Sequence, residues 1–140
     1  MTDWHNRFLD LADHIGGWSK DPSTKVGAVI VRPDRTIVSV GYNGFPRNVR
    51  DEPHRYEKRE IKYQMVVHAE MNAILTAGQS LQHCTLYVSP LQPCPQCAAA
   101  IIQSGMWRVV TRESNREDWK ERFEVTCQMF KEARVKLEVL

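Results

Sequence analysis

Two short motifs, His68-Ala69-Glu70 and Pro93-Cys94-Pro95-Gln96-Cys97, constrain this chain more than any other feature. Together they supply one imidazole, two thiols and one carboxylate. Histidine and cysteine are the usual ligands of Zn²⁺, and three protein ligands leave the fourth tetrahedral position open, which distinguishes a catalytic zinc site from a structural one. The sequence therefore predicts one Zn²⁺ per chain, bound by His68, Cys94 and Cys97.

Both motifs are expected at the start of a helix. Pro95 suits the first helical position, where its missing N–H is not needed. Cys94 and Cys97 then lie three residues apart on one face, and the positive end of the helix dipole favours their thiolates. His68 and Glu70 would diverge by about 200° within a regular helix, so they can face one centre only from its first turn.

Glu70 separates the catalytic interpretation from a zinc-stabilised interaction module. Two thiolates and a neutral imidazole balance the charge of Zn²⁺, and a water bound to such a metal has a pKa of roughly 7. A carboxylate beside that water can take up its proton and deliver it to a substrate. A structural zinc site has no use for Glu70 and needs a fourth protein ligand, which is not evident in the sequence.

Length and charge limit the other possibilities. The 140 residues predict a single zinc-dependent domain over 1–140. Four cysteines in a chain without a recognisable leader predict a reducing, cytoplasmic setting, where Cys-x-x-Cys is metal-binding rather than a disulfide. The net charge of +2 gives no electrostatic reason to expect a long nucleic-acid partner, and no apolar run is long enough to span a membrane.

Hydrophobic periodicity predicts alternating helices and strands. We expect helices over 2–18, 66–77 and 95–103, strands over 26–31, 37–42, 85–89, 107–111 and 135–140, and a long helix striped by Trp119, Phe123, Cys127 and Phe130. Residues 43–62 read as a loop that holds at most a helical turn. This order predicts an α/β protein of three layers (α/β/α) with a mixed five-stranded sheet, whose second half contains parallel pairs.

Several segments resemble the deoxycytidylate (dCMP) deaminase family of the cytidine deaminase superfamily. They are Ser19 to Ala28, Gly41 to Arg47, Val67 to Ile74, Thr85 to Val88 and Ala98 to Gly105. The resemblance covers roughly residues 18–111 and implies a cytidine-deaminase-like fold. His-x-Glu with Pro-Cys-x-x-Cys alone is the signature of all zinc nucleobase deaminases, so the additional segments are what indicate this branch.

The resemblance implies zinc-dependent hydrolysis of dCMP to dUMP and ammonia, which supplies dUMP for thymidylate synthesis. In that reaction Glu70 protonates N3 of the pyrimidine and then helps the amine leave. The ligand roles of His68, Cys94 and Cys97 are carried over, and Asn43 and Ala69 become contacts to the sugar or base. The family also implies a homo-oligomer, from dimer to hexamer, and a site for dCTP or dTTP with Mg²⁺ at Gly41, Tyr42 and Gly44.

The substrate remains open on the residues alone. Basic side chains in the 43–62 segment include candidates for the 5′-phosphate, because arginine matches phosphate as a bidentate fork. They are Arg47, Arg50, Arg55, Lys58, Arg59 and Lys62. Arg47 is the first candidate and Lys25 the second. The same metal site also allows cytosine, cytidine, guanine or a tRNA adenosine as substrate; the near-neutral charge disfavours tRNA.

Overall fold

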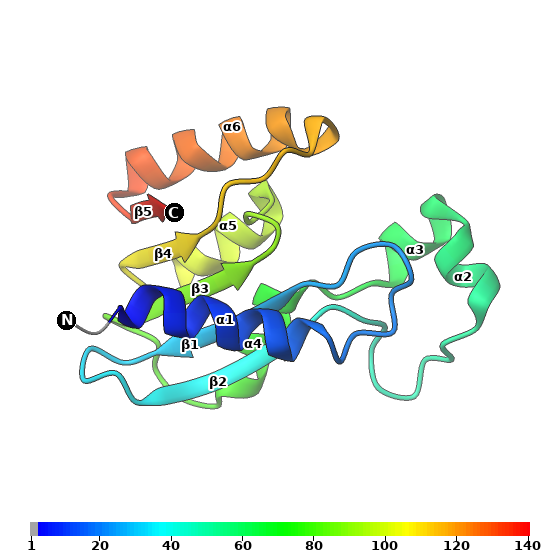
Figure 1. The fold of residues 1–140 in the computed structure, drawn as a ribbon, viewed down its shortest axis with the longest axis horizontal. Helices are drawn as coiled ribbons and strands as arrows, with labels where there is room; N and C mark the ends of the chain where they lie inside the picture. The colour runs from blue at the N-terminus through cyan, green and yellow to red at the C-terminus, as the bar shows by residue number, and fades with distance from the viewer. Residues whose placement is uncertain (1–2) are drawn as a thin grey trace.

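The computed structural model describes residues 3–140 as one five-stranded sheet with six helices (Figure 1). In chain order the elements are α1 (Trp4–Gly16), β1 (Gly27–Val31), β2 (Ile37–Tyr42), α2 (Pro53–Glu57), α3 (Arg59–Met65), α4 (Ala69–Ala77), β3 (Thr85–Ser89), α5 (Pro95–Gln103), β4 (Arg108–Thr111), α6 (Glu117–Ala133) and β5 (Lys136–Val139). In this part of the chain no helix is long and apolar enough to cross a membrane.

The sheet is mixed, with strand order β2-β1-β3-β4-β5. β1 pairs antiparallel with both β2 and β3, whereas β3, β4 and β5 run parallel to one another. The parallel pairs require crossover connections, and α5 and α6 provide them. The predicted mixed sheet with parallel pairs in the second half of the chain is confirmed.

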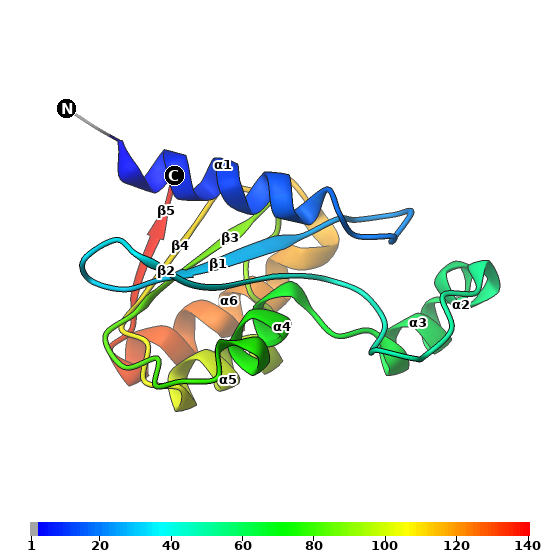
Figure 2. The same ribbon diagram turned by 90° about the horizontal axis from the view of Figure 1, so that it is seen from below.

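Helices cover the sheet on both faces (Figure 2). α1 lies on one face, and α4, α5 and α6 lie on the other. Successive side chains of a strand point to opposite faces, so a strand between two helical layers is apolar throughout. β1 and β3 are accordingly buried at every position. Phe8 and Leu9 of α1 pack against Val29 on one face, while Ile101 and Phe130 belong to the core of the other. The three-layer prediction is therefore confirmed.

The 43–62 segment is more helical than the sequence predicted. α2 and α3 occupy much of it and extend away from the body of the protein (Figures 1 and 2). Side-chain contacts outside the helices' own turns support them: the Phe45 and Tyr56 rings stack with centroids 4.3 Å apart, and Lys62 Nζ lies 2.8 Å from Asp21 Oδ2. The prediction of a loop with at most one helical turn was wrong because such contacts leave no periodic signal in the segment itself.

β2, β3 and α5 have the predicted bounds, whereas the bounds of the other elements predicted by range differ by one to three residues. The helix expected over 66–77 begins at Ala69, because Val67 forms a two-way backbone bridge with Gly44. α1 begins at Trp4, where Asp3 accepts a hydrogen bond of 3.1 Å from the Asn6 amide, and ends at Gly16. Residue 2, which was expected in this helix, lies outside the described residues.

Candidate active site

The first turn of α4 brings His68 and Glu70 to one pocket. His68 directly precedes the helix with an extended backbone (φ −70°, ψ 156°), and Glu70 is the second helical residue. Because His68 lies outside the helix, the divergence of two regular helical positions does not apply to this pair. Both side chains line the pocket together with Ala69. The geometric condition derived from the sequence is met.

Cys94 and Cys97 lie at the start of α5, as the sequence predicted. Cys94 directly precedes the helix and Pro95 occupies its first position. Both cysteines are buried, with exposed fractions of 3% and 2%. The Thr126 hydroxyl donates a hydrogen bond of 2.8 Å to the Pro93 carbonyl, which fastens the segment before α5 to α6.

The side chains of His68, Cys94 and Cys97 fit a zinc ion. Their ligand atoms all lie within 4.8 Å of one another. Nδ1 of His68 lies 3.4 Å from each of the two sulfurs. Zn–S bonds of about 2.3 Å and Zn–N bonds of about 2.0 Å at a tetrahedral angle place N and S roughly 3.5 Å apart. The observed spacing therefore matches a tetrahedral Zn²⁺ with three protein ligands.

The electrostatics of the two thiols also favour a cation between them. A hydrogen bond from Cys97, with a second from His68, lowers the pKa of the Cys94 thiol to about 4. The same pairing raises the pKa of Cys97, because burial and an adjacent thiolate both oppose a second negative charge. A divalent cation between the sulfurs removes this conflict, and coordination deprotonates a thiol outright.

Glu70 is a buried carboxyl at the base of the pocket. Its side chain is 4% exposed, and burial raises its pKa to about 7. No ion pair to Glu70 occurs among residues 3–140, and it is not part of the metal-ligand group. A carboxyl that is not a ligand but lies two residues from one is placed to transfer protons at the metal.

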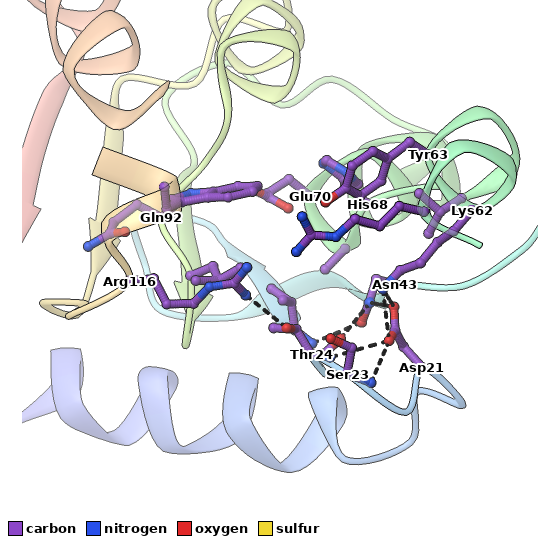
Figure 3. Close-up of a pocket in the computed structure, with 16 residues that line it drawn as sticks. Asp21, Ser23, Thr24, Asn43, Lys62, Tyr63, His68, Glu70, Gln92 and Arg116 are labelled. Carbon is purple, nitrogen blue, oxygen red and sulfur yellow. Dashed lines mark hydrogen bonds and ion pairs between the residues drawn. The ribbon is translucent and has the colours of Figure 1, made fainter. Parts of the chain in front are cut away.

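A hydrogen-bond network forms the opposite side of the pocket (Figure 3). Asp21, only 1% exposed, accepts hydrogen bonds from the Ser23 and Thr24 amides at 2.8 and 3.2 Å. Its carboxylate also pairs with Lys62 Nζ at 2.8 Å. This ion pair joins the segment before β1 to α3, so that α3 is held beside the pocket.

Asn43, expected to contact the substrate, lines the pocket but is engaged within the protein. Its Oδ1 accepts a hydrogen bond of 2.9 Å from the Val26 amide, and its Nδ2 donates one of 2.9 Å to the Thr24 carbonyl. A weaker contact of 3.4 Å reaches Asp21. Through these hydrogen bonds, Asn43 also holds the segment that contains Thr24 in position.

The two leading candidates for the phosphate do not line the pocket. Arg47 is exposed in the segment before α2, and Lys25 is exposed with its Nζ bonded at 2.8 Å to the Ser19 carbonyl. The basic side chains of the pocket are Arg59, Lys62 and Arg116. Arg59 and Lys62 belong to the basic run singled out from the sequence, at its far end rather than at Arg47.

The Gly41-Tyr42-Asn43-Gly44 segment, expected to bind an effector, is closely packed at Gly41 but open at Tyr42 and Gly44. A Cβ on Gly41 would lie 2.5 Å from the Ala69 carbonyl oxygen, so glycine here allows β2 to contact the backbone of α4. The Gly44 amide donates to the Val67 carbonyl at 3.1 Å. Tyr42, in contrast, is 41% exposed and meets Trp18 edge to face at 6.3 Å.

Arg116 and Trp119 were not singled out as site residues from the sequence. Arg116 precedes α6 and donates a hydrogen bond of 2.8 Å to the Thr24 hydroxyl, 92 positions away. Its other nitrogens bind the Asp118 carboxylate at 3.0 and 2.6 Å. The Trp119 indole N–H donates to the Gln92 carbonyl at 2.9 Å. No local pattern marks either residue, because only the fold brings α6 to the pocket.

Comparison with known proteins identifies the family of this arrangement. Residues 2–113 match the family model described as the cytidine and deoxycytidylate deaminase zinc-binding region. An uncharacterized deaminase of the luxG 3′ region of Aliivibrio fischeri is 45% identical over 140 residues, which cover 98% of this chain and 93% of the relative. A probable deoxycytidylate deaminase of Caenorhabditis elegans is 48% identical over 81% of this chain, and the human deoxycytidylate deaminase is 40% identical over 77%.

The chain spans 59% of the length of the nematode relative and 64% of that of the human relative. The dCMP deaminase of cyanophage S-TIM5, solved in complex with dCMP and dUMP, superposes with a TM-score of 0.78 at 24% identity, and the match covers 100% of this chain and 99% of the phage chain. At that identity the superposition shows the shared fold. With the zinc-site geometry and the family match together, this chain belongs to the cytidine and deoxycytidylate deaminase family.

Proposed function

We propose that residues 1–140 form a single zinc-dependent deaminase domain that hydrolyses dCMP to dUMP and ammonia. The main observation behind the proposal is a single pocket whose two walls differ in their chemistry. Buried Glu70 lies beside the three candidate zinc ligands on one side, and three basic side chains face the same space from the other. Glu70 and the candidate zinc ligands provide the groups that deamination requires. The basic side chains on the other side suit the 5′-phosphate of a nucleotide substrate.

The catalytic roles follow from position. His68, Cys94 and Cys97 hold the metal. Zinc, when bound, lowers the pKa of a coordinated water to roughly 7 and so supplies a nucleophile at neutral pH. Glu70 would take up one proton of the water as it adds to C4 and deliver it to N3 of the pyrimidine. It would then take the second proton from the new C4 hydroxyl and pass it to the amine, so that the C4–N bond breaks and ammonia leaves as the C4 carbonyl forms. Burial of Glu70 keeps bulk water from competing in these transfers.

Arg59 and Arg116 are the groups we assign to the 5′-phosphate. Arg116 is oriented by Thr24 and Asp118, and Arg59 lines the same pocket from α3. Arginine pairs bidentately with phosphate. Lys62 is already paired with Asp21, so it positions α3 rather than binding the phosphate directly. Asn43 and Ala69 border the space left for the sugar and base.

Relatives named as deoxycytidylate deaminases support dCMP as substrate, as does the phage structure solved with dCMP and dUMP. The product dUMP would feed thymidylate synthesis. The test is a deamination screen with dCMP, CMP, deoxycytidine, cytosine, guanine and tRNA. We expect dCMP to have the highest kcat/KM. Equal kcat/KM for deoxycytidine and dCMP would contradict the phosphate assignment, and turnover of tRNA or guanine alone would contradict the proposed substrate.

We further propose that the chain assembles as a homo-oligomer and that dCTP and dTTP with Mg²⁺ change its kinetics. Exposed Trp18 and Tyr42 form an aromatic surface beside the pocket end of β2, and aromatic side chains are enriched at interfaces. Light scattering tests the assembly, with a fully active monomer as the contrary result. Kinetics with dCMP in the presence of each triphosphate test the regulation, and unchanged parameters would contradict it.

A further inference from the structure

A second pocket lies at the end of the sheet away from the candidate active site. We call it the arginine pocket. The start of α1, the turn between β1 and β2, and the first residues of β3 and β4 form it, all at the same end of the molecule (Figure 1). Its lining residues are Asp3, Trp4, His5, Val31, Arg32, Pro33, Arg35, Thr85, Tyr87 and Arg108. The deaminase reaction proposed above uses none of them.

Two of the three arginines keep much of their hydrogen-bonding capacity. Arg108 donates from Nε to the Thr85 hydroxyl at 3.0 Å, and its terminal nitrogens have no hydrogen bond within residues 3–140. Arg35 lies at a turn position with φ of 70°, and its guanidinium stacks over the Trp4 ring at 5.2 Å. Stacking orients the guanidinium without using its N–H donors.

The Tyr87 side chain lines the same pocket as these arginines. Its ring is almost fully buried, and its hydroxyl is 2.9 Å from Nδ1 of His5. Burial raises the pKa of Tyr87, so the hydroxyl stays neutral and available for hydrogen bonding. The third arginine, Arg32, is held through Gln79 at 2.9 Å. The pocket therefore collects positive charge around neutral hydrogen-bonding groups.

Carboxylates offset only part of this charge. Asp3 is the one acidic side chain among the lining residues, and it is engaged in capping α1 through Asn6. The adjacent Glu138 pairs with His5 at 3.0 Å and with Lys136 at 2.9 Å. The three arginines thus outnumber the two carboxylates, Asp3 in the lining and Glu138 beside it, and the site keeps a net positive charge.

We propose that the arginine pocket binds a phosphate-bearing anion. Its volume of about 340 Å³ lies within the range of small-molecule sites and accommodates more than one phosphate group. Guanidinium forks recognise phosphate oxygens bidentately, and two arginines with free donors favour a di- or triphosphate chain over a single phosphate. The site lies apart from the metal, so binding there needs neither zinc nor deaminase activity.

Calorimetric titration of the full-length protein with inorganic phosphate, pyrophosphate and tripolyphosphate tests the proposal. We expect saturable binding that strengthens with chain length and weakens with added salt. Arg108→Gln and Arg35→Gln should each raise the Kd for tripolyphosphate about ten- to a hundredfold, the effect of one charge-assisted hydrogen-bonding group. Arg108→Lys, which keeps the charge without the fork, should fall between these variants and the parent.

Two controls make the result decisive. Arg7 also stacks on Trp4, at 4.9 Å, but does not line the pocket, so Arg7→Gln should bind tripolyphosphate as the parent does. Arg116→Gln should remove only phosphate binding at the active-site pocket, to which Arg116 is assigned, and should keep the tripolyphosphate binding that Arg108→Gln weakens. No saturable binding, equal binding by Arg108→Gln and the parent, or loss of binding in Arg116→Gln would each overturn the proposal. None of these outcomes bears on dCMP deamination, which is measured separately.

Discussion

The two walls of the candidate active site are built in opposite ways. The wall to which we assign catalysis (the catalytic wall: His68, Glu70, Cys94 and Cys97) comes from two contiguous motifs, each at the start of a helix that packs on the sheet. The recognition wall (Asp21, Arg59, Lys62 and Arg116) comes from three segments far apart in the sequence. The catalytic cysteines and Glu70 are almost fully buried, whereas Arg59 is exposed and Arg116 is half-buried.

This contrast reflects what each wall has to do. Metal ligands and a proton-transfer group must be held within about 0.5 Å, which rigid helix ends surrounded by core residues provide. A phosphate can be bound by long side chains that retain part of their hydration, because charge attraction tolerates small displacements. We therefore expect substitutions in the catalytic wall to abolish chemistry and substitutions in the recognition wall to change affinity or stability.

The largest effect is expected from removing a metal ligand. Cys97→Ala leaves two protein ligands, so the purified protein should lose its zinc and all measurable deamination. Metal analysis of the parent and the variant provides the measurement. Cys127→Ala, at the half-buried cysteine of α6, is the matched control and should keep both zinc and activity. Full zinc occupancy in Cys97→Ala would refute the ligand assignment.

Glu70→Gln should retain zinc and fold but reduce kcat by roughly 10²–10⁴-fold, because it removes the group that transfers protons. KM should change little, since the amide occupies nearly the same volume. Steady-state kinetics with dCMP and metal analysis separate the two effects. Glu124→Gln, at an exposed position of α6, serves as control. Turnover within about threefold of the parent would contradict the proton-transfer role of Glu70.

Lys62→Met should destabilise the protein. It leaves the Asp21 carboxylate, 1% exposed, without its cation, and breaking one side of a buried ion pair costs about 3–5 kcal/mol. The free energy of unfolding in urea measures this loss, and Lys58→Met is the exposed control on the same segment. The double variant with Asp21→Asn should recover much of the stability. No recovery would mean that Lys62 acts through another contact.

Arg116→Gln should lower kcat/KM for dCMP about ten- to a hundredfold and leave deoxycytidine almost unaffected, because only the nucleotide carries the phosphate. The ratio of the two specificity constants is the measurement. Lys120→Gln, an exposed position on α6, controls for a general change of charge. Equal losses for nucleotide and nucleoside would show that Arg116 shapes the pocket through Thr24 rather than binding phosphate.

The same contrast explains how far the sequence predicted the molecule. The mixed five-stranded sheet and the candidate zinc site follow from local information: β-rich runs, the His-x-Glu motif, a proline after Cys94, and two cysteines three residues apart. The place of Arg116 in the pocket could not be predicted from local sequence, because its partner Thr24 lies 92 positions away. The helices α2 and α3 could not be predicted from local sequence either, because helices of five and seven residues have little stability of their own. Tyr56 supports them by stacking on Phe45 of the same segment, and Lys62 by its ion pair with Asp21, 41 positions away.

The smallest effect is expected within the segment that sequence analysis favoured for phosphate binding. Arg47 and Arg59 both belong to its basic run, but only Arg59 lines the pocket. Arg47→Gln should leave KM for dCMP within about a factor of two, as is usual for an exposed surface substitution, while Arg59→Gln raises it. The pair keeps net charge equal, so any difference reports position rather than charge. If Arg47→Gln raised KM more than Arg59→Gln, the segment would have to close over bound dCMP, and the recognition wall would be assembled only in the complex.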